Sequence, residues 1–213
     1  MLPKLVLFDF DGTLADGFPG IAEAVNAVRM SRGHEPVELE HVKQYVGWGL
    51  DHLIKKIVPD ADLDVDIPLY RQHYAGTMLT GTELLPGAAP VVQTLHQRGV
   101  RLGVCSNKKR IYTEQLLEHL GIMPPIKKVF GPDDVPRHKP APDMLLAALK
   151  YFQVSASETI YVGDMIVDIH CAHAAGVPIW AIPTGAMTAE QLSAERPTKL
   201  LKNMSEMLSL LKI

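Results

Sequence analysis

The chain of 213 residues has only two cysteines, Cys105 and Cys171, and they lie far apart in the sequence. Two isolated thiols are too few for a cysteine zinc site or for a disulfide framework. Apolar residues make up 47% of the chain, which is enough for a sizeable hydrophobic core. We therefore expect a globular protein of a reducing compartment, the cytoplasm, that is stabilised by its core rather than by cross-links.

Long runs of one charge sign and long apolar runs are also missing. The formal net charge is −3, so the basic surface of a nucleic-acid-binding protein is not expected. No apolar run approaches the roughly 18 residues that a membrane span needs. The opening MLPKLVLFDFDG has too short an apolar run for a signal peptide. We expect neither nucleic acid nor a membrane as a partner, and a monomer or a dimer.

Short apolar runs alternate with longer helical patterns along most of the chain. Buried strands are expected at residues 5–8, 100–105, 127–130, 159–163 and 177–182, and helices near residues 87–98, 110–120, 141–152, 165–175 and 203–211. This alternation predicts an α/β fold, a doubly wound, Rossmann-like parallel sheet with helices on both faces. Right-handed crossovers would bring the carboxyl ends of the strands to one edge, where ligands of such sheets bind.

A long gap separates the first two predicted strands. Helical patterns fill it at residues 17–32, 38–45, 49–57 and 66–79, and no strand is evident among them. Because an unstructured loop of this length is uncommon, we predict a helical cap domain, residues 16–83, inserted into a core domain, residues 1–15 and 84–213. Glycine and proline at the junctions 14–17 and 80–87 suit hinges.

Polar side chains follow four of the predicted strands and should meet at the ligand-binding edge of the sheet. In chain order the residues at these strand ends are Asp9 and Asp11 with Gly12 and Thr13, then Ser106, Asn107 and Lys108, then Lys139, and finally Asp164 and Asp168.

The carboxylates in this set need a compensating cation, since each would otherwise raise the pKa of its neighbours. Oxygen ligands with open positions suit Mg²⁺, which keeps waters and binds phosphate oxygens. Asp164 and Asp168 have i, i+4 spacing at a helix start and so share one face. The Lys139 ammonium, the Ser106 hydroxyl and backbone N–H groups of the loops would hold an anion beside the metal. A phosphoryl group matches such a site.

Asp9 and Asp11 suggest how the phosphoryl group reacts. Aspartate is an established nucleophile in phosphoryl transfer, through an aspartyl phosphate. Asp9 lies where the strand ends, and Asp11 is two residues further on, where it would reach the leaving group. Gly12 permits a tight turn. One carboxylate would then attack phosphorus, and the other would handle the proton.

Four motifs resemble those of the haloacid dehalogenase superfamily, and of its phosphatases in particular. In chain order they are DFDGT at 9–13, Ser106 in VCSNK, Lys139 in RHKPAPD and GDMIVD at 163–168. The segments YVGWGL (45–50), LLPGAAPVVQTLHQRG (84–99) and CSNKKR (105–110) are similar to those of the phosphoglycolate phosphatase-like group. The DxD pair alone is a weak signal, whereas four motifs in order, each after a strand, are specific.

The resemblance implies a role for each motif residue. Asp9 would be the nucleophile, and Asp11 the general acid and then the base. The implied Mg²⁺ ligands are Asp9, the Asp11 carbonyl and Asp164, with Asp168 supporting the metal site, and the implied phosphoryl contacts are Gly12, Thr13, Ser106, Asn107 and Lys139. The implied protein is a Mg²⁺-dependent phosphatase of a small phosphorylated metabolite, with phosphoglycolate as the first guess.

Several other functions stay open. A phosphomutase of this fold would share every catalytic residue, and an inorganic pyrophosphatase would share the type of cap. A haloacid dehalogenase is disfavoured, because it needs no metal and leaves Asp11 without a task. A regulatory module that only binds a phosphorylated ligand would be expected to lack Asp9, Asp11, Lys139 or Asp164, and all four are present.

The expected cap gives weaker signals than the sheet edge. Trp48 would either line the substrate side or pack within the cap. Arg71, His73 and Tyr74 could bind a substrate carboxylate or a second phosphate, although we expect a solvated helix face here. Chains of the resembling group often read DGTLxDS, and Gly17 stands here in place of the serine, which would loosen the cap hinge.

Overall fold

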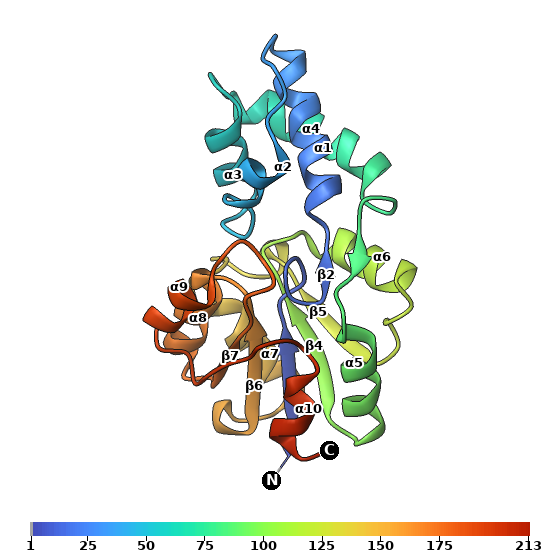
Figure 1. Ribbon diagram of the computed structural model, residues 1–213, viewed down its shortest axis with the longest axis vertical. Coiled ribbons are helices and arrows are strands. Elements are labelled where there is room, and N and C mark those ends of the chain that lie inside the picture. The colour runs from blue at the N-terminus through green and yellow to red at the C-terminus, as the bar shows by residue number, and fades with distance from the viewer. Residues whose placement is uncertain (1) are drawn as a thin grey trace.

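The computed structural model describes residues 2–213, and a parallel sheet forms its centre (Figure 1). The strands are β1 (Leu5–Phe8), β4 (Arg101–Cys105), β5 (Ile126–Phe130), β6 (Thr159–Gly163), β7 (Ile179–Ala181) and β8 (Lys199–Leu200), in the order β5-β4-β1-β6-β7-β8. Every pairing in this sheet is parallel. The predicted fold class is confirmed. Strand β8 was not predicted, because its two residues are exposed and form no apolar run.

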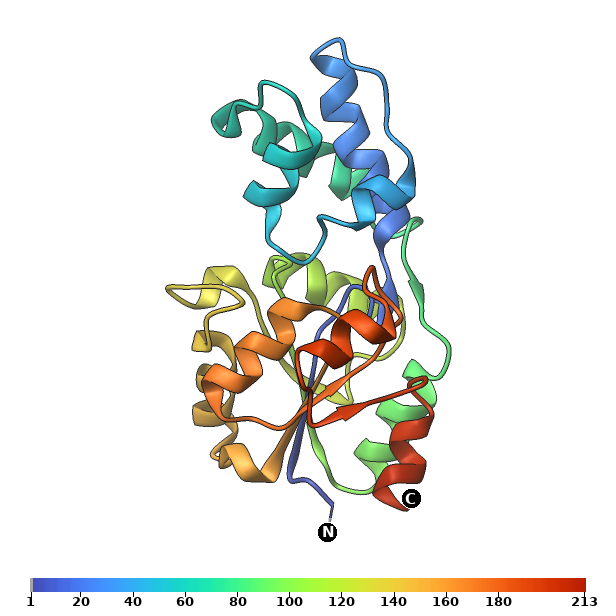
Figure 2. The ribbon, with the colours of Figure 1, turned by 60° about the vertical axis from the view of Figure 1, so that its left-hand side comes forward.

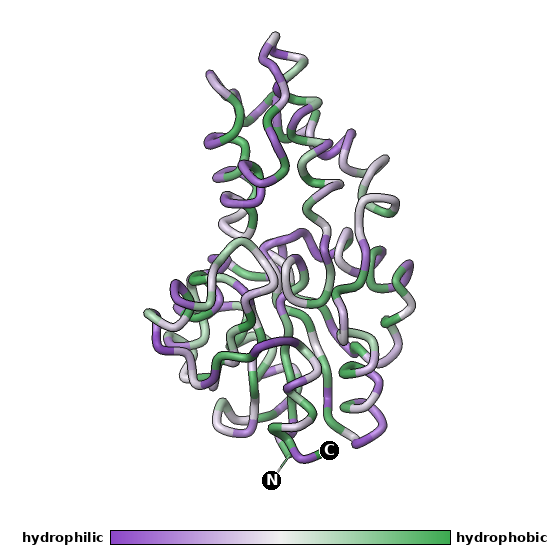
Figure 3. The backbone as a smooth tube through the Cα atoms, in the orientation of Figure 1, coloured by the Kyte–Doolittle hydropathy of each residue, from purple (hydrophilic) through white to green (hydrophobic). Residues whose placement is uncertain are grey.

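Helices cover both faces of the sheet. One face carries α5 (Ala88–Gln97), α6 (Arg110–His119) and α10 (Glu206–Leu211), and the other carries α7 (Asp143–Phe152), α8 (Ile166–Ala175) and α9 (Ala189–Ala194). Short 3₁₀ turns lie at Pro132–Asp134 and Ala156–Glu158. In β1, Val6 and Phe8 pack against the first layer, while Leu5 and Leu7 pack against the second, as the two-residue period of a strand requires. Hydrophobic stretches accordingly gather around the central strands (Figure 3).

The segment between β1 and β4 forms a separate group of helices beyond the carboxyl ends of the strands (Figure 2). It contains α1 (Phe18–Ser31), α2 (Leu39–Lys43), α3 (Leu50–Ile57) and α4 (Leu63–Thr77), near the four predicted ranges. Residues 17–79 contain no strand, as expected, but two short strands that were not predicted, β2 (Ala15–Asp16) and β3 (Glu83–Leu84), pair antiparallel at the two ends of the segment. Each has only two residues, too few for a sequence pattern. The division into a core domain and a cap domain stays a prediction.

Two glycines bring the start and the end of this segment together. The N–H of Gly20 donates to the carbonyl of Gly81 over 3.3 Å, and the N–H of Gly81 donates to the carbonyl of Thr77 over 2.9 Å. A Cβ on Gly81 would lie 2.6 Å from both the nitrogen and the Cα of Gly20. The helical segment therefore enters and leaves the sheet side by side, through a contact that has no room for a side chain.

The described residues also bear on the predicted location. No helix within residues 2–213 combines the length and the apolar character that crossing a bilayer requires. The cytoplasmic location stays a prediction.

We expect Gly81→Ala to lower the free energy of unfolding by about 1 to 3 kcal/mol, because the new methyl group meets backbone that cannot move aside cheaply. Gly76→Ala, in the last turns of α4, is the matched control, since a Cβ there has no neighbour within 4 Å. The control should be neutral or stabilising by up to about 1 kcal/mol, through helix propensity. Urea unfolding of both variants checks this, and equal stability of the two would contradict the close contact.

Candidate active site

Asp9 is held rigidly at the carboxyl end of β1. Its N–H donates to the carbonyl of Val162 over 2.8 Å, which continues the parallel ladder between β1 and β6 by one residue. The residue is only 3% exposed, and Oδ1 lies 2.9 Å from Nζ of Lys139. The strand therefore fixes a carboxylate at the sheet edge, as the sequence predicted for its position.

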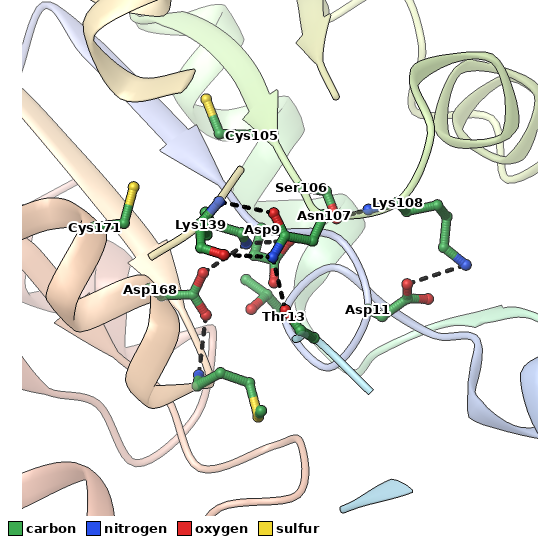
Figure 4. A network of polar contacts seen from close by, with 12 residues as sticks. Asp9, Asp11, Thr13, Cys105, Ser106, Asn107, Lys108, Lys139, Asp168 and Cys171 are labelled. Atoms are coloured by element: carbon green, nitrogen blue, oxygen red, sulfur yellow. Dashed lines mark hydrogen bonds and ion pairs between the residues drawn. The ribbon is translucent and has the colours of Figure 1, made fainter. Parts of the chain in front are cut away.

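Lys139 is a fully buried cation between two carboxylates (Figure 4). Its Nζ lies 2.6 Å from Oδ1 of Asp168, 2.9 Å from Oδ1 of Asp9 and 3.0 Å from the hydroxyl of Tyr161. Burial alone would lower the pKa of Lys139, but Asp168 and Asp9 raise it above its ordinary value. The ammonium is therefore charged, and it ties Asp9 to Asp168.

Asp164 has one oxygen bound by the protein and one that is free. The Thr13 hydroxyl donates to Oδ1 over 2.8 Å, whereas the buried Oδ2 has no hydrogen-bond partner in the described part of the chain. A Cβ on Gly12 or Gly185 would lie 2.3 Å or 1.7 Å from Oδ2, so glycines make room for this oxygen. Burial, and then the charges of Asp168 and Asp9, raise the pKa of Asp164 well above its usual value.

The charges and oxygen atoms of this group fit a divalent cation. Asp9, Asp164 and Asp168 each offer one oxygen, and these atoms all lie within 4.8 Å of one another. With Asp11, four carboxylates face two ammonium groups, which leaves two negative charges if all are ionised. Both oxygens of Asp168 already accept hydrogen bonds from the protein. Asp9 and Asp164 are therefore the better candidates for direct ligands, and hard oxygen donors of this kind suit Mg²⁺.

Asp11 lies to one side of this group and pairs with Lys108 (Figure 4). Lys108 Nζ lies 3.0 Å from Oδ2 of Asp11, and it also contacts the hydroxyl of Tyr74 on α4. Oδ1 of Asp11 is buried without a partner, and a Cβ on Gly17 would lie only 2.4 Å from it. Burial raises the pKa of Asp11, and Lys108 opposes this shift in part. Asp11 is thus held by one oxygen, through a lysine that reaches from the sheet edge to the helical segment.

Ser106 and Asn107 follow β4 and have different surroundings. Ser106 is 3% exposed and lines the cleft above Asp9. The amide nitrogen of Asn107 donates to the carbonyls of Gly47 and Lys139, over 2.9 and 3.0 Å, and its oxygen accepts the N–H of Lys139 over 3.0 Å. Asn107 therefore connects the loop before α3 to the Lys139 loop, and its predicted contact with a phosphoryl group stays a prediction.

The turn after Asp9 uses several of its own donors. The N–H groups of Gly12 and Thr13 donate to the carbonyls of Ala15 and Phe10, over 2.8 and 3.2 Å. Gly12 has φ +79°, a conformation that favours glycine. Substrate contacts of Gly12 and Thr13 stay predictions, and these bonds favour a role in shaping the turn and orienting Asp164.

The site opens into a cleft of about 580 Å³ between the sheet edge and the helical segment. Asp9, Asp11 and Ser106 lie on the sheet side, and Trp48 and Arg71 are among the residues on the helical side. Trp48 therefore lines the cleft, one of its two predicted positions. The solvated helix face expected at Arg71, His73 and Tyr74 is confirmed for His73, which is exposed. It is wrong for the other two residues, because Tyr74 is 2% exposed and Arg71 lines the cleft.

Sequence reasoning missed residues that complete the site. Lys108 was placed with Ser106 and Asn107 after the second predicted strand but was given no role, although its strand-end position was a usable signal. Gly185 and Thr184 lie in the loop after β7, where Thr184 donates to the carbonyl of Gly12 over 2.6 Å, and the same rule applied to the fifth strand would have found them. Tyr161 faces Asp168 from within β6, and nothing in the strand pattern marks it as a site residue.

Comparisons with known proteins agree with this arrangement. A family model described as haloacid dehalogenase-like hydrolase matches residues 6–182. A phosphoglycolate phosphatase of Rhodospirillum rubrum is 36% identical over 195 residues, covering 86% of this chain and 81% of the relative. One from Vibrio parahaemolyticus is 32% identical, covering 99% and 96%. A solved structure described as a haloacid dehalogenase-like hydrolase from Bacteroides fragilis superimposes with a TM-score of 0.91 at 28% identity, covering 96% and 99%.

We expect Asp164→Asn to abolish the stabilisation of the protein by Mg²⁺. In the wild type, Mg²⁺ at about 100 times its Kd should raise the melting temperature by about 5 to 10 °C. In chelator, Asp164→Asn should melt at or above the wild-type temperature, because it removes a buried charge repelled by Asp9 and Asp168. Thermal melts with and without Mg²⁺ test this, with exposed Asp64→Asn as control. A wild-type Mg²⁺ shift in Asp164→Asn would refute the assignment.

Proposed function

The chain belongs to the haloacid dehalogenase-like hydrolase family, and on this basis we propose that it is a Mg²⁺-dependent phosphatase that acts on a small phosphate ester through an aspartyl phosphate. The observation that carries the proposal is the position of Asp9. It follows a central strand and lines the cleft, beside Lys139 and grouped with Asp164 and Asp168. Such a set of charges suits a phosphoryl group, which needs cations around its oxygens and a nucleophile in line with phosphorus.

The first step transfers the phosphoryl group to the protein. A carboxylate oxygen of Asp9 attacks phosphorus, the bond between phosphorus and the ester oxygen breaks, and that oxygen leaves with the electron pair. Asp11, in its protonated form, donates a proton to the leaving oxygen, so that an alcohol departs. The raised pKa of Asp11 suits a proton donor. Lys139 holds Asp9 in place through the ion pair at Oδ1.

The second step restores Asp9. Asp11, now a carboxylate, accepts a proton from a water molecule that attacks the phosphorus of the aspartyl phosphate. The bond between phosphorus and the Asp9 oxygen breaks, the electron pair returns to the Asp9 carboxylate, and inorganic phosphate leaves. Asp9 and the protonated Asp11 are thereby regenerated, so the sum is hydrolysis of one ester bond. Lys108 keeps Asp11 oriented in both steps, through the pair at Oδ2.

Asp9, Asp164 and the supporting Asp168 would hold Mg²⁺, which would supply positive charge to the phosphoryl oxygens. Lys139 and the Ser106 hydroxyl would complete the phosphoryl pocket. The helical segment of residues 16–83 would act as a cap that excludes water and selects the leaving group. The relatives named phosphoglycolate phosphatase support phosphoglycolate as the first substrate to test.

We expect Asp9→Asn to abolish phosphate release while the fold stays intact, because an amide cannot form the aspartyl phosphate. Phosphate release would be measured on phosphoglycolate, pyrophosphate and sugar phosphates, with Mg²⁺ and with chelator. The matched control is Asp64→Asn, which makes the same change at an exposed position of α4 and should keep wild-type rates.

The outcomes of this panel separate the candidate functions. Wild-type rates in Asp9→Asn would exclude Asp9 as the nucleophile, and full activity in chelator would exclude a metal requirement. Preference for pyrophosphate would indicate a pyrophosphatase. Conversion of glucose 1-phosphate without phosphate release would indicate a mutase, and tight binding of phosphorylated ligands without any turnover would indicate a regulatory module.

We expect Lys108→Met to lower kcat on ethyl phosphate by about 10- to 100-fold, because Asp11 loses the ammonium that pairs with its Oδ2 and orients it. On p-nitrophenyl phosphate the loss should be smaller, since its leaving group departs without a proton. Tyr74→Phe, which removes only the hydroxyl that contacts Lys108, should give a weaker version of the same pattern. Equal losses on both esters would show that Lys108 does not act through Asp11.

A further inference from the structure

Arg71, on α4, is a cation of the cleft that forms no ion pair within residues 2–213. It lines the cleft, and its Nε is buried without a hydrogen-bond partner. Within residues 2–213, the arginines that form ion pairs are Arg32, Arg110 and Arg137. A guanidinium stays charged at every physiological pH, and a buried charged donor without a partner is costly. The site is therefore suited to an anion that comes from outside the chain.

The other cations of the cleft differ from Arg71 in this respect. Lys108, which lines the cleft, is paired with Asp11, and the fully buried Lys139 beside the cleft is paired with Asp9 and Asp168. Lys55 and Lys109 also line the cleft, but neither has a buried nitrogen that lacks a partner among residues 2–213. Among the cleft cations that form no ion pair within residues 2–213, Arg71 thus differs from Lys55 and Lys109 in having a buried nitrogen that lacks a partner.

The other residues of the helical wall strengthen this argument. Val46, Trp48 and Leu53 give this side of the cleft an apolar surface. Ionic attraction is stronger beside apolar walls than in open water. The planar guanidinium also presents paired donors that match a carboxylate or a phosphate. An ester with an uncharged leaving group would leave these donors unpaired, so it should be a poor substrate.

We propose that Arg71 binds a second oxyanion, carried by the leaving group of the substrate. The protein would then select small phosphate esters that bear a further carboxylate or phosphate, and it would discriminate against esters of neutral alcohols. This inference rests on the proposed function, because it takes the scissile phosphoryl group to lie at Asp9, at the other side of the same cleft. Arg71 would act on specificity and take no part in bond breaking.

The test compares three esters with two-carbon leaving groups on the wild type, Arg71→Met and Arg71→Lys. The esters are phosphoglycolate, ethane-1,2-diol bisphosphate and 2-hydroxyethyl phosphate, the last of which has an uncharged leaving group and is called the neutral ester below. In Arg71→Met, kcat/KM should fall about 10- to 100-fold on the substrates with a second anion, mainly through KM, and by less than about threefold on the neutral ester. A larger loss on phosphoglycolate would identify a carboxylate as the preferred anion, and a larger loss on the bisphosphate would identify a phosphate.

His73→Gln is the matched control, because His73 is on the same helix but exposed and outside the cleft. It should leave all three values unchanged. Thermal melts verify that each variant folds. Arg71→Lys keeps the positive charge but loses the paired donors of the guanidinium, so its loss of kcat/KM should again be larger on the two substrates with a second anion, though smaller than in Arg71→Met. This variant keeps the test valid if Arg71→Met is unstable.

Equal losses on all three esters, or no loss on any, would overturn the role of Arg71. Such a failure differs from failure of the proposed function. In the first case the wild type still releases phosphate and Asp9→Asn does not. In the second case no ester is hydrolysed, or Asp9→Asn is as active as the wild type.

Discussion

The site depends on one electrostatic constraint, which is that four carboxylates lie at a buried sheet edge beside only two lysines of the described residues 2–213. Lys139, fully buried, holds Asp9 and Asp168 together through contacts of 2.9 and 2.6 Å. Asp164 has no cation of its own, and its pKa is raised by burial and by its acidic neighbours. The apoprotein therefore stores repulsion that an added divalent cation would relieve. The same feature that makes the site costly to fold prepares it for metal and phosphate.

The architecture explains why this cost is tolerable. Each charged group follows a strand of one parallel sheet, and the strands are anchored by apolar layers on both faces. Strand β1 fixes Asp9 through the ladder to β6, so the carboxylate cannot move away from Lys139. Small residues then adapt the loops to the charges, since Gly12 and Gly185 make room for one oxygen of Asp164. The rigid sheet thus holds the charged groups in a preorganised arrangement.

Much of this could be predicted from the sequence, because the signals were local. Apolar runs gave five of the strands, and the strand-end rule gave the positions of Asp9, Ser106, Lys139 and Asp164. Strand β8 and the short pair β2–β3 were missed because two-residue strands carry no periodic pattern. Tyr161 was missed for another reason. It belongs to a fully buried strand, and only tertiary structure shows that its hydroxyl reaches Asp168.

Contacts between the sheet edge and the helical segment could not be predicted for a third reason, which is that they join residues far apart in the sequence. Asn107 binds the carbonyl of Gly47, and Lys108 joins Asp11 to the hydroxyl of Tyr74. Both residues lie in the loop after β4. This loop therefore contacts the helical segment on one side and the Lys139 loop and Asp11 on the other. If the helical segment moves away, Lys108 loses Tyr74, and its remaining partner Asp11 becomes more open to water. Proton transfer by Asp11 would then be favoured only with the helices in place, which couples enclosure of the substrate to its chemistry.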